Sequence, residues 1–445
     1  MEDQNDIISE DKSSNTYINW FSRYIIILII SCLLGAICGF VMVGFNYLLN
    51  FFKLGFSFIP YFIAPLIAGA LTSLLVKKGV KNNLFLIMGT GAAQFITEAT
   101  GRESAYDRFP VLLSKTLATS WTYGSGMLCG KEGPGLLIGA NLGYIIAKRF
   151  KRLELDLSDY FFIGASACTS AILRTPISGA LFCAELPYSN HIRYKSLLPS
   201  IFASIIAFLI FSFFFEFKPL IKTDLTAVEK IDYITLLPLL IFFGILTGLI
   251  MFIIITCLGR WMKMIKNHYN RRLGFWKLPL IGAALYSVFL FIVIPLIDPQ
   301  YKGVLITPDT SILSFITSSI KDMHWLTLLI LIILFLVAIL FSIGFYNSAG
   351  IILPLMLLGA LIGGLFGVIF YPEYPELFVI LGISAVLGAS INNPITAIIL
   401  IVEMTWEPYL FIPAGIVTIL AYIFSGPNSI IPGQRTVKKI KLDDN

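Results

Sequence analysis

The stretch GKEGPG, Gly130–Gly135, places a lysine beside a glutamate inside an otherwise apolar region of the chain. WTYGSGMLC precedes it and LLIGANLGYIIA follows it. If this region crosses a membrane, an ionisable residue within it marks a functional site by default. The glycines and the proline around the pair predict a break in the helix, which a membrane tolerates only where protein buries it or a wet cavity adjoins it.

The composition indicates that the chain is built for lipid. Apolar residues make up 57% of its 445 residues and charged residues only 13%, whereas soluble chains are about half apolar and about a quarter charged. The mean hydropathy is +0.85. Roughly a dozen apolar runs approach the ~20 residues that cross hydrocarbon. We therefore predict an all-α polytopic membrane protein; the cleanest runs are Tyr24–Asn50, Phe58–Val76, Ser196–Phe215, Leu236–Leu258, Leu278–Ile297 and Leu326–Ile343.

The charged residues predict the topology. The net charge of +6 comes from short basic breaks, KKGVKNN, KRFKR and RWMKMIKNHYNRRLGFWK, and from the tail RTVKKIK. By the positive-inside rule these breaks and the C-terminus face the cytoplasm, so we expect no nucleic-acid partner. The polar start lacks the pattern of a cleaved signal peptide. We expect a cytoplasmic segment at 1–20, a transmembrane domain at 21–435 and a short cytoplasmic tail at 436–445.

Cysteine and histidine patterns give no sign of a metal site. The six cysteines lie in apolar runs without a C-x-x-C pair, which is typical of small core residues. His191, His268 and His324 each stand alone in a polar break. We expect neither a metal nor another cofactor.

The chain also contains an internal repeat. GASACTSAILRTPISGALFCAEL, Gly164–Leu186, aligns without a gap with GISAVLGASINNPITAIILIVEM, Gly382–Met404, at an offset of 218 residues. Upstream, Gly133–Gly143 matches Leu353–Gly363 at an offset of 220. Two matches in the same order predict two inverted structural repeats of tilted and broken helices, as in transporter folds. We place them at about 60–215 and about 235–425.

Three breaks of this kind suggest an anion site. GTGAA at Gly89–Ala93, GKEGPG, and GFYNSAGIILP at Gly344–Pro354 each run into an apolar helical stretch. A helix start presents free N–H groups and about half a positive charge, so converging starts bind an anion. Partial charges also let the ion leave again, which a full charge at low dielectric would hinder.

Glu132 then has a physical role as a gate. A carboxylate at a helix start can occupy the anion site itself until it is protonated or swings away. A structural pair with Lys131 is disfavoured, because adjacent residues on a helix do not face each other.

At these residues the sequence resembles the CLC family of chloride channels and proton–chloride exchangers. GKEGPG resembles the family motif G-[KR]-E-G-P, through Gly130, Lys131, Gly133 and Pro134. RTPISGALFCAE, NSAGIILPLMLLGALIG and NNPITAIILIVEMT resemble three further motifs in the family's order. The resemblance implies a homodimer with a pore in each subunit and chloride or a similar small anion as the substrate. Because the chain stops soon after Arg435, we expect no CBS domains.

The resemblance also implies roles for single residues. Glu132 falls on the gating glutamate and Leu186 on the position of a proton-relaying glutamate, which is lost here. The anion-binding set that it implies is Thr90, Gly91, Gly350, Ile351, Ile352 and Ile431. Ile431 stands where relatives usually present a tyrosine.

Several functions remain open from the sequence. The first is a voltage-gated-type chloride channel or loosely coupled transporter gated by Glu132. The second is a chloride/proton antiporter with another proton route in place of Leu186. A remote third is an intramembrane hydrolase on GSG at Gly124–Gly126, which lacks a histidine at membrane depth; otherwise we expect no enzyme. The compact length favours a prokaryotic inner membrane.

Overall fold

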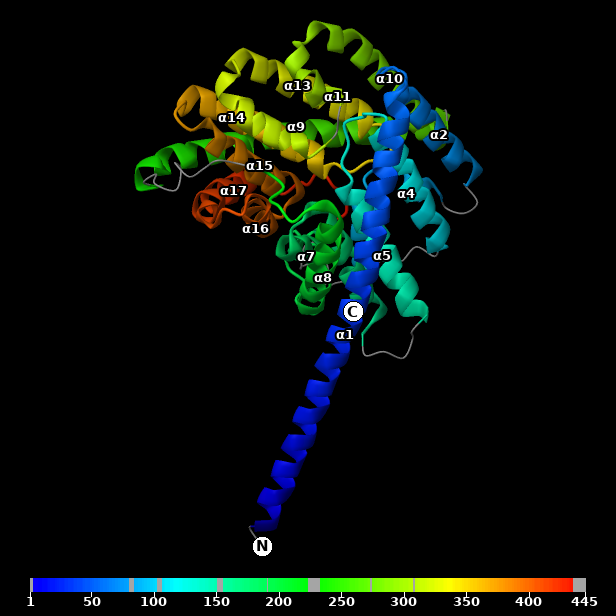
Figure 1. The fold of residues 1–445 in the computed structure, drawn as a ribbon, viewed down its shortest axis with the longest axis vertical. Helices are drawn as coiled ribbons and strands as arrows, with labels where there is room; N and C mark the ends of the chain where they lie inside the picture. Colours follow the sequence, from blue (N-terminus) through cyan, green and yellow to red (C-terminus); the bar gives the residue numbers. More distant parts are fainter. Residues whose placement is uncertain are drawn as a thin grey trace.

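The structure, a computed structural model, describes residues 3–79, 84–101, 106–149, 155–189, 191–222, 233–272, 274–306 and 309–434. Helices dominate this part of the chain, and it contains no strand; Gly130 and Gly350 form an isolated β-bridge. The long helix α1 and the packed bundle beside it are shown in Figure 1. The first half comprises α1 Asp3–Ser57, α2 Ala64–Lys78, α3 Ala92–Ala99, α4 Arg108–Gly124, α5 Glu132–Arg149, α6 Leu157–Leu173, α7 Pro176–Glu185 and α8 Leu197–Phe215.

The second half repeats the pattern of long and short helices. It comprises α9 Tyr233–Arg272, α10 Leu278–Val293, α11 Lys302–Ile306, α12 Ser311–Ser319, α13 Trp325–Ser342, α14 Ile352–Phe370, α15 Pro375–Ile391, α16 Pro394–Thr405 and α17 Phe411–Ser425. The 3₁₀ turn η2, Leu84–Ile87, precedes α3, and η4, Phe275–Lys277, precedes α10. The expected tail at 436–445 lies outside the described residues, and the segment at 1–20 forms the start of α1 from Asp3.

Seven helices in the described part are long and apolar enough to span a membrane, which makes this a multi-pass membrane protein. The number is lower than the roughly dozen apolar runs of the sequence, because glycine and proline cut several of them into shorter pieces such as α3, α7 and α16. The spans are Phe21–Ser57, Leu197–Phe215, Ile234–His268, Phe275–Leu296, Trp325–Ser342, Ile352–Phe370 and Pro408–Ser425.

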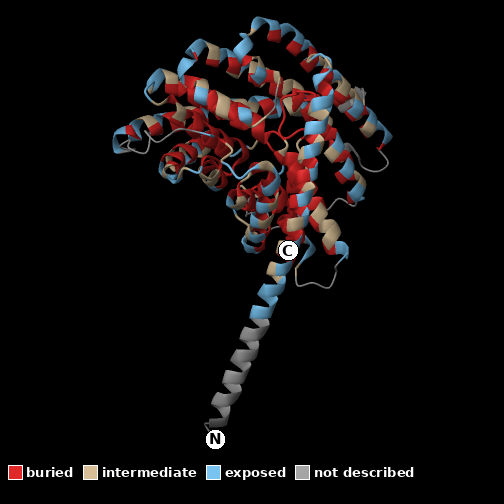
Figure 2. Cartoon of the chain, viewed as in Figure 1, coloured by how far each residue is buried: buried red, intermediate tan, exposed pale blue. Residues whose placement is uncertain are grey.

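The core lies around α5, α6, α14 and α15. In the most apolar 18-residue stretch of α14, 83% of the residues are buried, whereas in the corresponding stretch of α13 only 39% are buried. Figure 2 shows the buried residues in the interior of the bundle and exposed residues along its outer helices. A lipid-facing helix leaves apolar side chains uncovered, so α13 lies at the periphery and α14 at the centre.

Small residues pack the two central helix pairs in the same way. Gly139 of α5 lies against the backbone of α6 at Gly164, where a methyl group would strike the Gly164 carbonyl. Gly359 of α14 meets Gly382 of α15 in the same manner. These pairs are related by the offsets of 220 and 218 residues found in the sequence. The duplication is therefore structural, and glycine allows the close helix approach.

A reciprocal contact between α7 and α16 shows that the repeats are inverted. The Glu185 carboxylate at the end of α7 accepts hydrogen bonds from Thr396 N (3.0 Å) and Oγ1 (2.6 Å) at the start of α16. Glu403, near the end of α16, accepts in the same way from Ser178 N (2.8 Å) and Oγ (2.6 Å) at the start of α7. Each helix therefore caps the other, which requires the two to run antiparallel.

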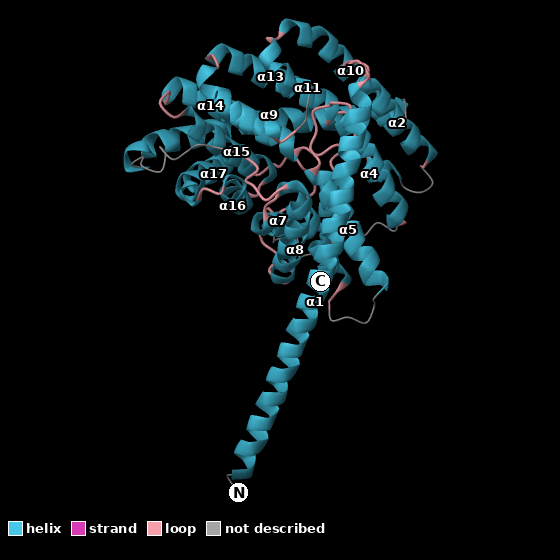
Figure 3. Ribbon diagram, viewed as in Figure 1, coloured by secondary structure: helices cyan, strands magenta, loops and turns pink. Residues whose placement is uncertain are grey.

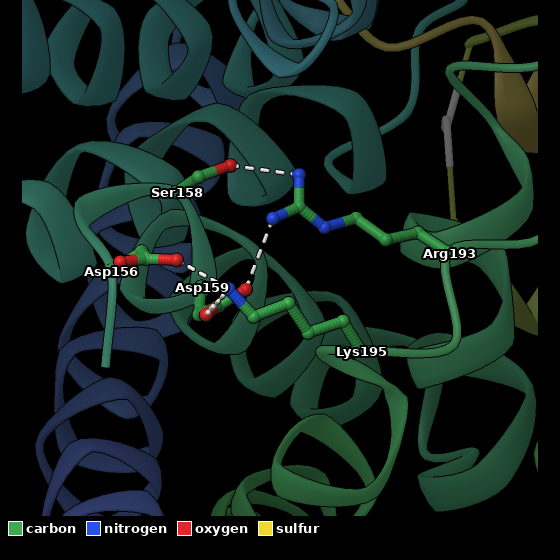
Figure 4. A network of polar contacts seen from close by, with 5 residues as sticks. All are labelled: Asp156, Ser158, Asp159, Arg193 and Lys195. Carbon is green, nitrogen blue, oxygen red and sulfur yellow. Dashed lines mark hydrogen bonds and ion pairs between the residues drawn. The ribbon is translucent and has the colours of Figure 1, made fainter. Parts of the chain in front are cut away.

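A polar network fixes the start of α6 to the segment before α8. The buried Asp159 carboxylate pairs with Arg193 (3.0 Å) and Lys195 (3.3 Å). Lys195 also bonds Asp156, and Arg193 donates to Ser158 Oγ (2.8 Å), as Figure 4 shows. The hydrogen bond from Lys195 lowers the pKa of Asp156, so this surface pair stays ionised over a wide pH range.

Candidate functional site

The three broken segments meet at the centre of the molecule. Gly130 and Gly350 exchange two backbone hydrogen bonds, both with N···O distances of 2.7 Å. Gly89 N–H donates to the Tyr346 carbonyl (3.0 Å), and Ala349 N–H donates to the Gly89 carbonyl (3.3 Å). Loops cross in this central region in Figure 3. The starts of α3, α5 and α14 are thereby held against one another.

Glycine is required where these loops touch. Gly91 has a φ of 80°, in the left-handed region, and precedes the first residue of α3. A Cβ at Gly91 would lie 3.0 Å from the Gly133 carbonyl oxygen, and one at Gly133 would strike the Thr90 carbonyl. A larger residue at either position would push the starts of α3 and α5 apart.

The helix starts present backbone donors to this junction. Thr90 is partly buried and stands two residues before α3, while Ile351 is the N-cap and Ile352 the first residue of α14. Both isoleucines are buried. The third residue of α5 and of α14 is a proline, Pro134 and Pro354. Proline is favoured in a first turn because the missing N–H has no helical partner there.

The Glu132 carboxylate lies at the same junction. Glu132 is the first residue of α5 and is 1% exposed. Its carboxylate folds back beside Gly130, so that a Cβ at 130 would overlap an oxygen of Glu132. Backbone amides at the starts of α5 and α14, including that of Leu353, lie close to it. Neither carboxylate oxygen makes a hydrogen bond of regular geometry in the structure.

Lys131 points elsewhere. Its ammonium group donates to Asn46 Oδ1 of α1 (3.1 Å). Lys53 and Asp309 form an ion pair (3.2 Å) that joins α1 to the segment before α12. Lys131 therefore hydrogen-bonds Asn46 and does not pair with the adjacent Glu132 in the described structure.

The C-terminal segment after α17 passes beside α3 and α7. Ile431 is buried in it, and the neighbouring Ile430 N–H donates to the Ser390 carbonyl (2.9 Å). A Cβ at Gly433 would lie 3.4 Å from Ile96 of α3. The Gln434 amide donates to the Leu186 carbonyl (3.0 Å). Ile431 therefore belongs to a segment in contact with α3, whose start follows Thr90.

Leu186 ends α7 as a fully buried apolar side chain. An aliphatic side chain cannot bind a proton at this position. The adjacent Glu185 is held at the start of α16 by Thr396. Glu185 therefore caps α16, and the next position, Leu186, has no ionisable group.

The sequence analysis missed Lys115 of α4. Its ammonium group is fully buried and donates to the carbonyls of Ile87 (2.8 Å) and Gly89 (2.6 Å). Lys115 therefore fixes the backbone of the loop that carries Thr90. A single lysine among the apolar and hydroxyl residues of LLSKTLATS was the signal that could have found it.

A buried polar network, also missed, ties the end of α3 to the middle of α5. Glu98 of α3 pairs with Arg108 (2.5 Å) and accepts from Tyr106 Oη (2.6 Å). Arg108 donates to Asn141 Oδ1 of α5 (3.1 Å), and the Tyr106 hydroxyl oxygen lies 3.2 Å from the same amide oxygen. Since the starts of α3 and α5 touch at Gly91 and Gly133 and the end of α3 is tied to the middle of α5, the two helices run side by side in the same direction.

These observations define a class of protein: a multi-pass membrane protein of two inverted repeats, in which broken helices from both repeats start at one central point. The chain belongs to the voltage gated chloride channel family, whose model matches residues 84–426.

Its relatives agree with this assignment. The chain is 26% identical to the H(+)/Cl(−) exchange transporter ClcA of Salmonella arizonae over 332 residues, which cover 71% of this chain and 67% of the relative. It is 27% identical, with the same coverage, to ClcA of Salmonella paratyphi A.

Solved structures share the fold. A slow cyanobacterial Cl−/H+ antiporter superposes with a TM-score of 0.75 at 19% identity, covering 94% of this chain and 98% of that one. A CLC-type fluoride/proton antiporter gives a TM-score of 0.74 at 21% identity, with 92% and 98% covered. The CLC fold predicted from the motifs is thus confirmed.

Proposed function

We propose that this protein exchanges chloride for protons across a membrane and that Glu132 gates the path in each subunit. The sequence placed a channel or loosely coupled transporter first and an antiporter second. The curated relatives, named as H(+)/Cl(−) exchange transporters, favour the antiporter. The observation that carries the proposal is the buried Glu132 carboxylate at the junction of three helix starts, without a regular hydrogen bond.

The mechanism follows from competition for the same donors. Helix starts stabilise negative charge, so an anion and the Glu132 carboxylate compete for the backbone amides of α5 and α14. When Glu132 takes up a proton it loses its charge, and the amides become free for chloride. When chloride leaves, the Glu132 acid gives up its proton, and the carboxylate that results returns to the amides. One residue thereby links the two ions.

The anion-binding residues are proposals at this site. Thr90 would add a hydroxyl donor in front of α3, with Gly91 allowing the turn. Gly350, Ile351 and Ile352 would contribute through the backbone at the start of α14. Ile431 would form an apolar wall in place of a phenol, which leaves the hydroxyl of Thr90 as the side-chain donor.

The inner half of the proton route differs from the family pattern. Leu186 cannot relay a proton, and Glu185 is engaged as a helix cap. An exchanger with this sequence must therefore lead protons to Glu132 through water or another carboxylate. The same observation favours the second candidate, passive chloride permeation, so the proton coupling has to be measured directly.

The assembly and orientation complete the proposal. By family resemblance, two copies form a homodimer in which each subunit has its own path. By the positive-inside rule, the basic ends of α2, α5 and α9 and both termini face the cytoplasm. A prokaryotic cell membrane remains the proposed location.

The reversal potential of the purified protein in vesicles tests this function. Under a fixed chloride gradient, an exchanger's reversal potential shifts when a pH gradient is added, because each transport cycle moves both ions. A value that equals the chloride equilibrium potential and ignores the pH gradient would leave passive permeation as the function.

A further inference from the structure

Five lysines gather at one end of the bundle without an acidic partner among the described residues. They are Lys77 and Lys78 at the end of α2, Lys263 and Lys266 in the last turns of α9, and Lys277 in η4. None of them forms an ion pair with a residue that the structure describes, whereas Lys53, Lys195, Lys218 and Lys321 all do. From 233 to 297 the sequence contains six basic residues and no aspartate or glutamate.

A small apolar cluster brings these lysines together. Val76, Ile265 and Leu278 belong to one buried cluster, against which Phe275 and Trp276 pack. Val76 precedes Lys77, Ile265 lies between Lys263 and Lys266, and Leu278 follows Lys277. Packing of their neighbours therefore places lysines from three segments around one surface.

Two of the ammonium groups lie near the ring of Trp276. Lys77 Nζ lies 4.7 Å and Lys277 Nζ 5.4 Å from the centroid of the Trp276 ring. Cation–π contacts attract each ammonium group to the ring, but they do not neutralise its charge. Two like charges around one ring favour an anion that can bridge them.

The position of the cluster points to lipid as the source of that anion. The apolar span Ile234–His268 ends near these lysines, and the next span, Phe275–Leu296, begins there. The lysines therefore lie where a membrane span meets the headgroup region. Tryptophan and lysine are typical of this level, and basic clusters beside spans attract anionic lipids.

We propose that Lys77, Lys78, Lys263, Lys266 and Lys277, around Trp276, bind the phosphate headgroup of an anionic phospholipid. The phosphate lies between the ammonium groups, and the acyl chains lie along the apolar surfaces of α2 and α10, which pack side by side (Figure 1).

Two of the segments that carry the lysines, η4 and the last turns of α9, contact a loop of the central site. Phe275 packs on Tyr346, with ring centroids 5.4 Å apart. Tyr346 Oη donates to the carbonyl of Met262 (3.4 Å), the residue before Lys263. Tyr346 has a φ of 61° and its own carbonyl accepts from Gly89 N–H. A headgroup that draws η4 and the end of α9 together therefore acts on the loop before Thr90. This regulatory part rests on the proposed transport function; the binding part does not.

Retention of phosphatidylglycerol by the purified full chain, measured by native mass spectrometry, tests the binding. The protein is incubated with mixed micelles of equal parts phosphatidylcholine and phosphatidylglycerol. We expect the wild type to retain phosphatidylglycerol preferentially and the double variant Lys77→Gln/Lys277→Gln to retain it roughly tenfold less, since each basic residue adds to headgroup attraction.

Two matched variants separate the site from total charge. Lys218→Gln/Lys321→Gln removes the same charge from lysines that already have acidic partners and should retain lipid like the wild type. Lys77→Arg/Lys277→Arg keeps the charge and should do the same. Equal retention by wild type and the Lys77→Gln/Lys277→Gln variant would overturn the proposal, as would release of the lipid by millimolar inorganic phosphate alone.

Transport in vesicles tests the regulatory part separately. We expect phosphatidylglycerol to change the chloride efflux of the wild type relative to pure phosphatidylcholine and to have little effect on Lys77→Gln/Lys277→Gln. Binding without an effect on efflux would overturn the coupling through Tyr346. Absence of efflux under every condition, with lipid still bound, would instead count against the proposed transport function.

Discussion

Gly130 and Glu132 are linked at the level of single atoms. The Glu132 carboxylate lies where a side chain at position 130 would begin, and a Cβ there would also lie 3.1 Å from the Leu353 Cβ. The far end of a glutamate side chain moves more easily than the backbone. A methyl group at 130 should therefore expel the carboxylate and leave the fold intact.

We predict that Gly130→Ala raises chloride efflux at neutral pH and weakens its pH dependence. The control is Gly259→Ala in α9, because a Cβ there has no neighbour within 4 Å. Efflux is measured from vesicles with a chloride electrode between pH 4.5 and 7.5. A Gly130→Ala variant that folds and keeps the wild-type pH profile would contradict the position assigned to the carboxylate.

Thr90 is the proposed side-chain donor in front of α3. We predict that Thr90→Ala changes the ranking of chloride, bromide and nitrate without abolishing transport, because the backbone donors at the helix starts remain. Losing one hydrogen bond of about 1 kcal/mol alters an affinity about fivefold. Thr90→Ser should restore the wild-type ranking, and an unchanged ranking in Thr90→Ala would remove Thr90 from the anion site.

Among the helices, α7 and α16 depend on each other. The carboxylates of Glu185 and Glu403 each accept hydrogen bonds from a backbone N–H and a hydroxyl at the start of the other helix. We predict that Glu185→Gln and Glu403→Gln each lower the thermal stability of the detergent-purified protein, by about 1 kcal/mol, the usual scale for losing a cap. The two effects should be similar because the contacts are related by the repeat.

The same pair of variants distinguishes a cap from a proton relay. If Glu185 is a cap, proton coupling in Glu185→Gln should match that in Glu403→Gln. Loss of coupling in Glu185→Gln alone, with stability unchanged, would show that Glu185 and not the apolar Leu186 position carries the inner proton.

The whole molecule was largely predictable where the sequence repeats itself. Offsets of 218 and 220 residues reflect helix pairs that must pack alike, with Gly139 on Gly164 and Gly359 on Gly382. The three broken segments were visible because glycine and proline stop a helix in any context. Only seven helices of the described part are long and apolar enough to span a membrane, because several apolar runs are divided into shorter helices.

Contacts between distant segments were beyond the reach of pattern analysis. Lys115 hydrogen-bonds the carbonyls of Ile87 and Gly89, and Glu98 meets Arg108 and Asn141, only because the packing of α3, α4 and α5 brings them together. The motif spacing carried no information on these partners. Likewise, Pro176 and Glu185 have the same spacing as Pro394 and Glu403, but the reciprocal caps that explain this match became visible only in the structure.

Chloride efflux from vesicles at a series of pH values, compared between the wild type and Glu132→Gln, tests the central claim most directly. If Glu132 closes the path as a charged carboxylate, wild-type efflux should rise as the pH falls, because protonation removes the plug. Glu132→Gln should be open throughout and lose most of this dependence. A folded Glu132→Gln variant whose efflux follows pH as the wild type does would contradict the assignment of Glu132 as the gate.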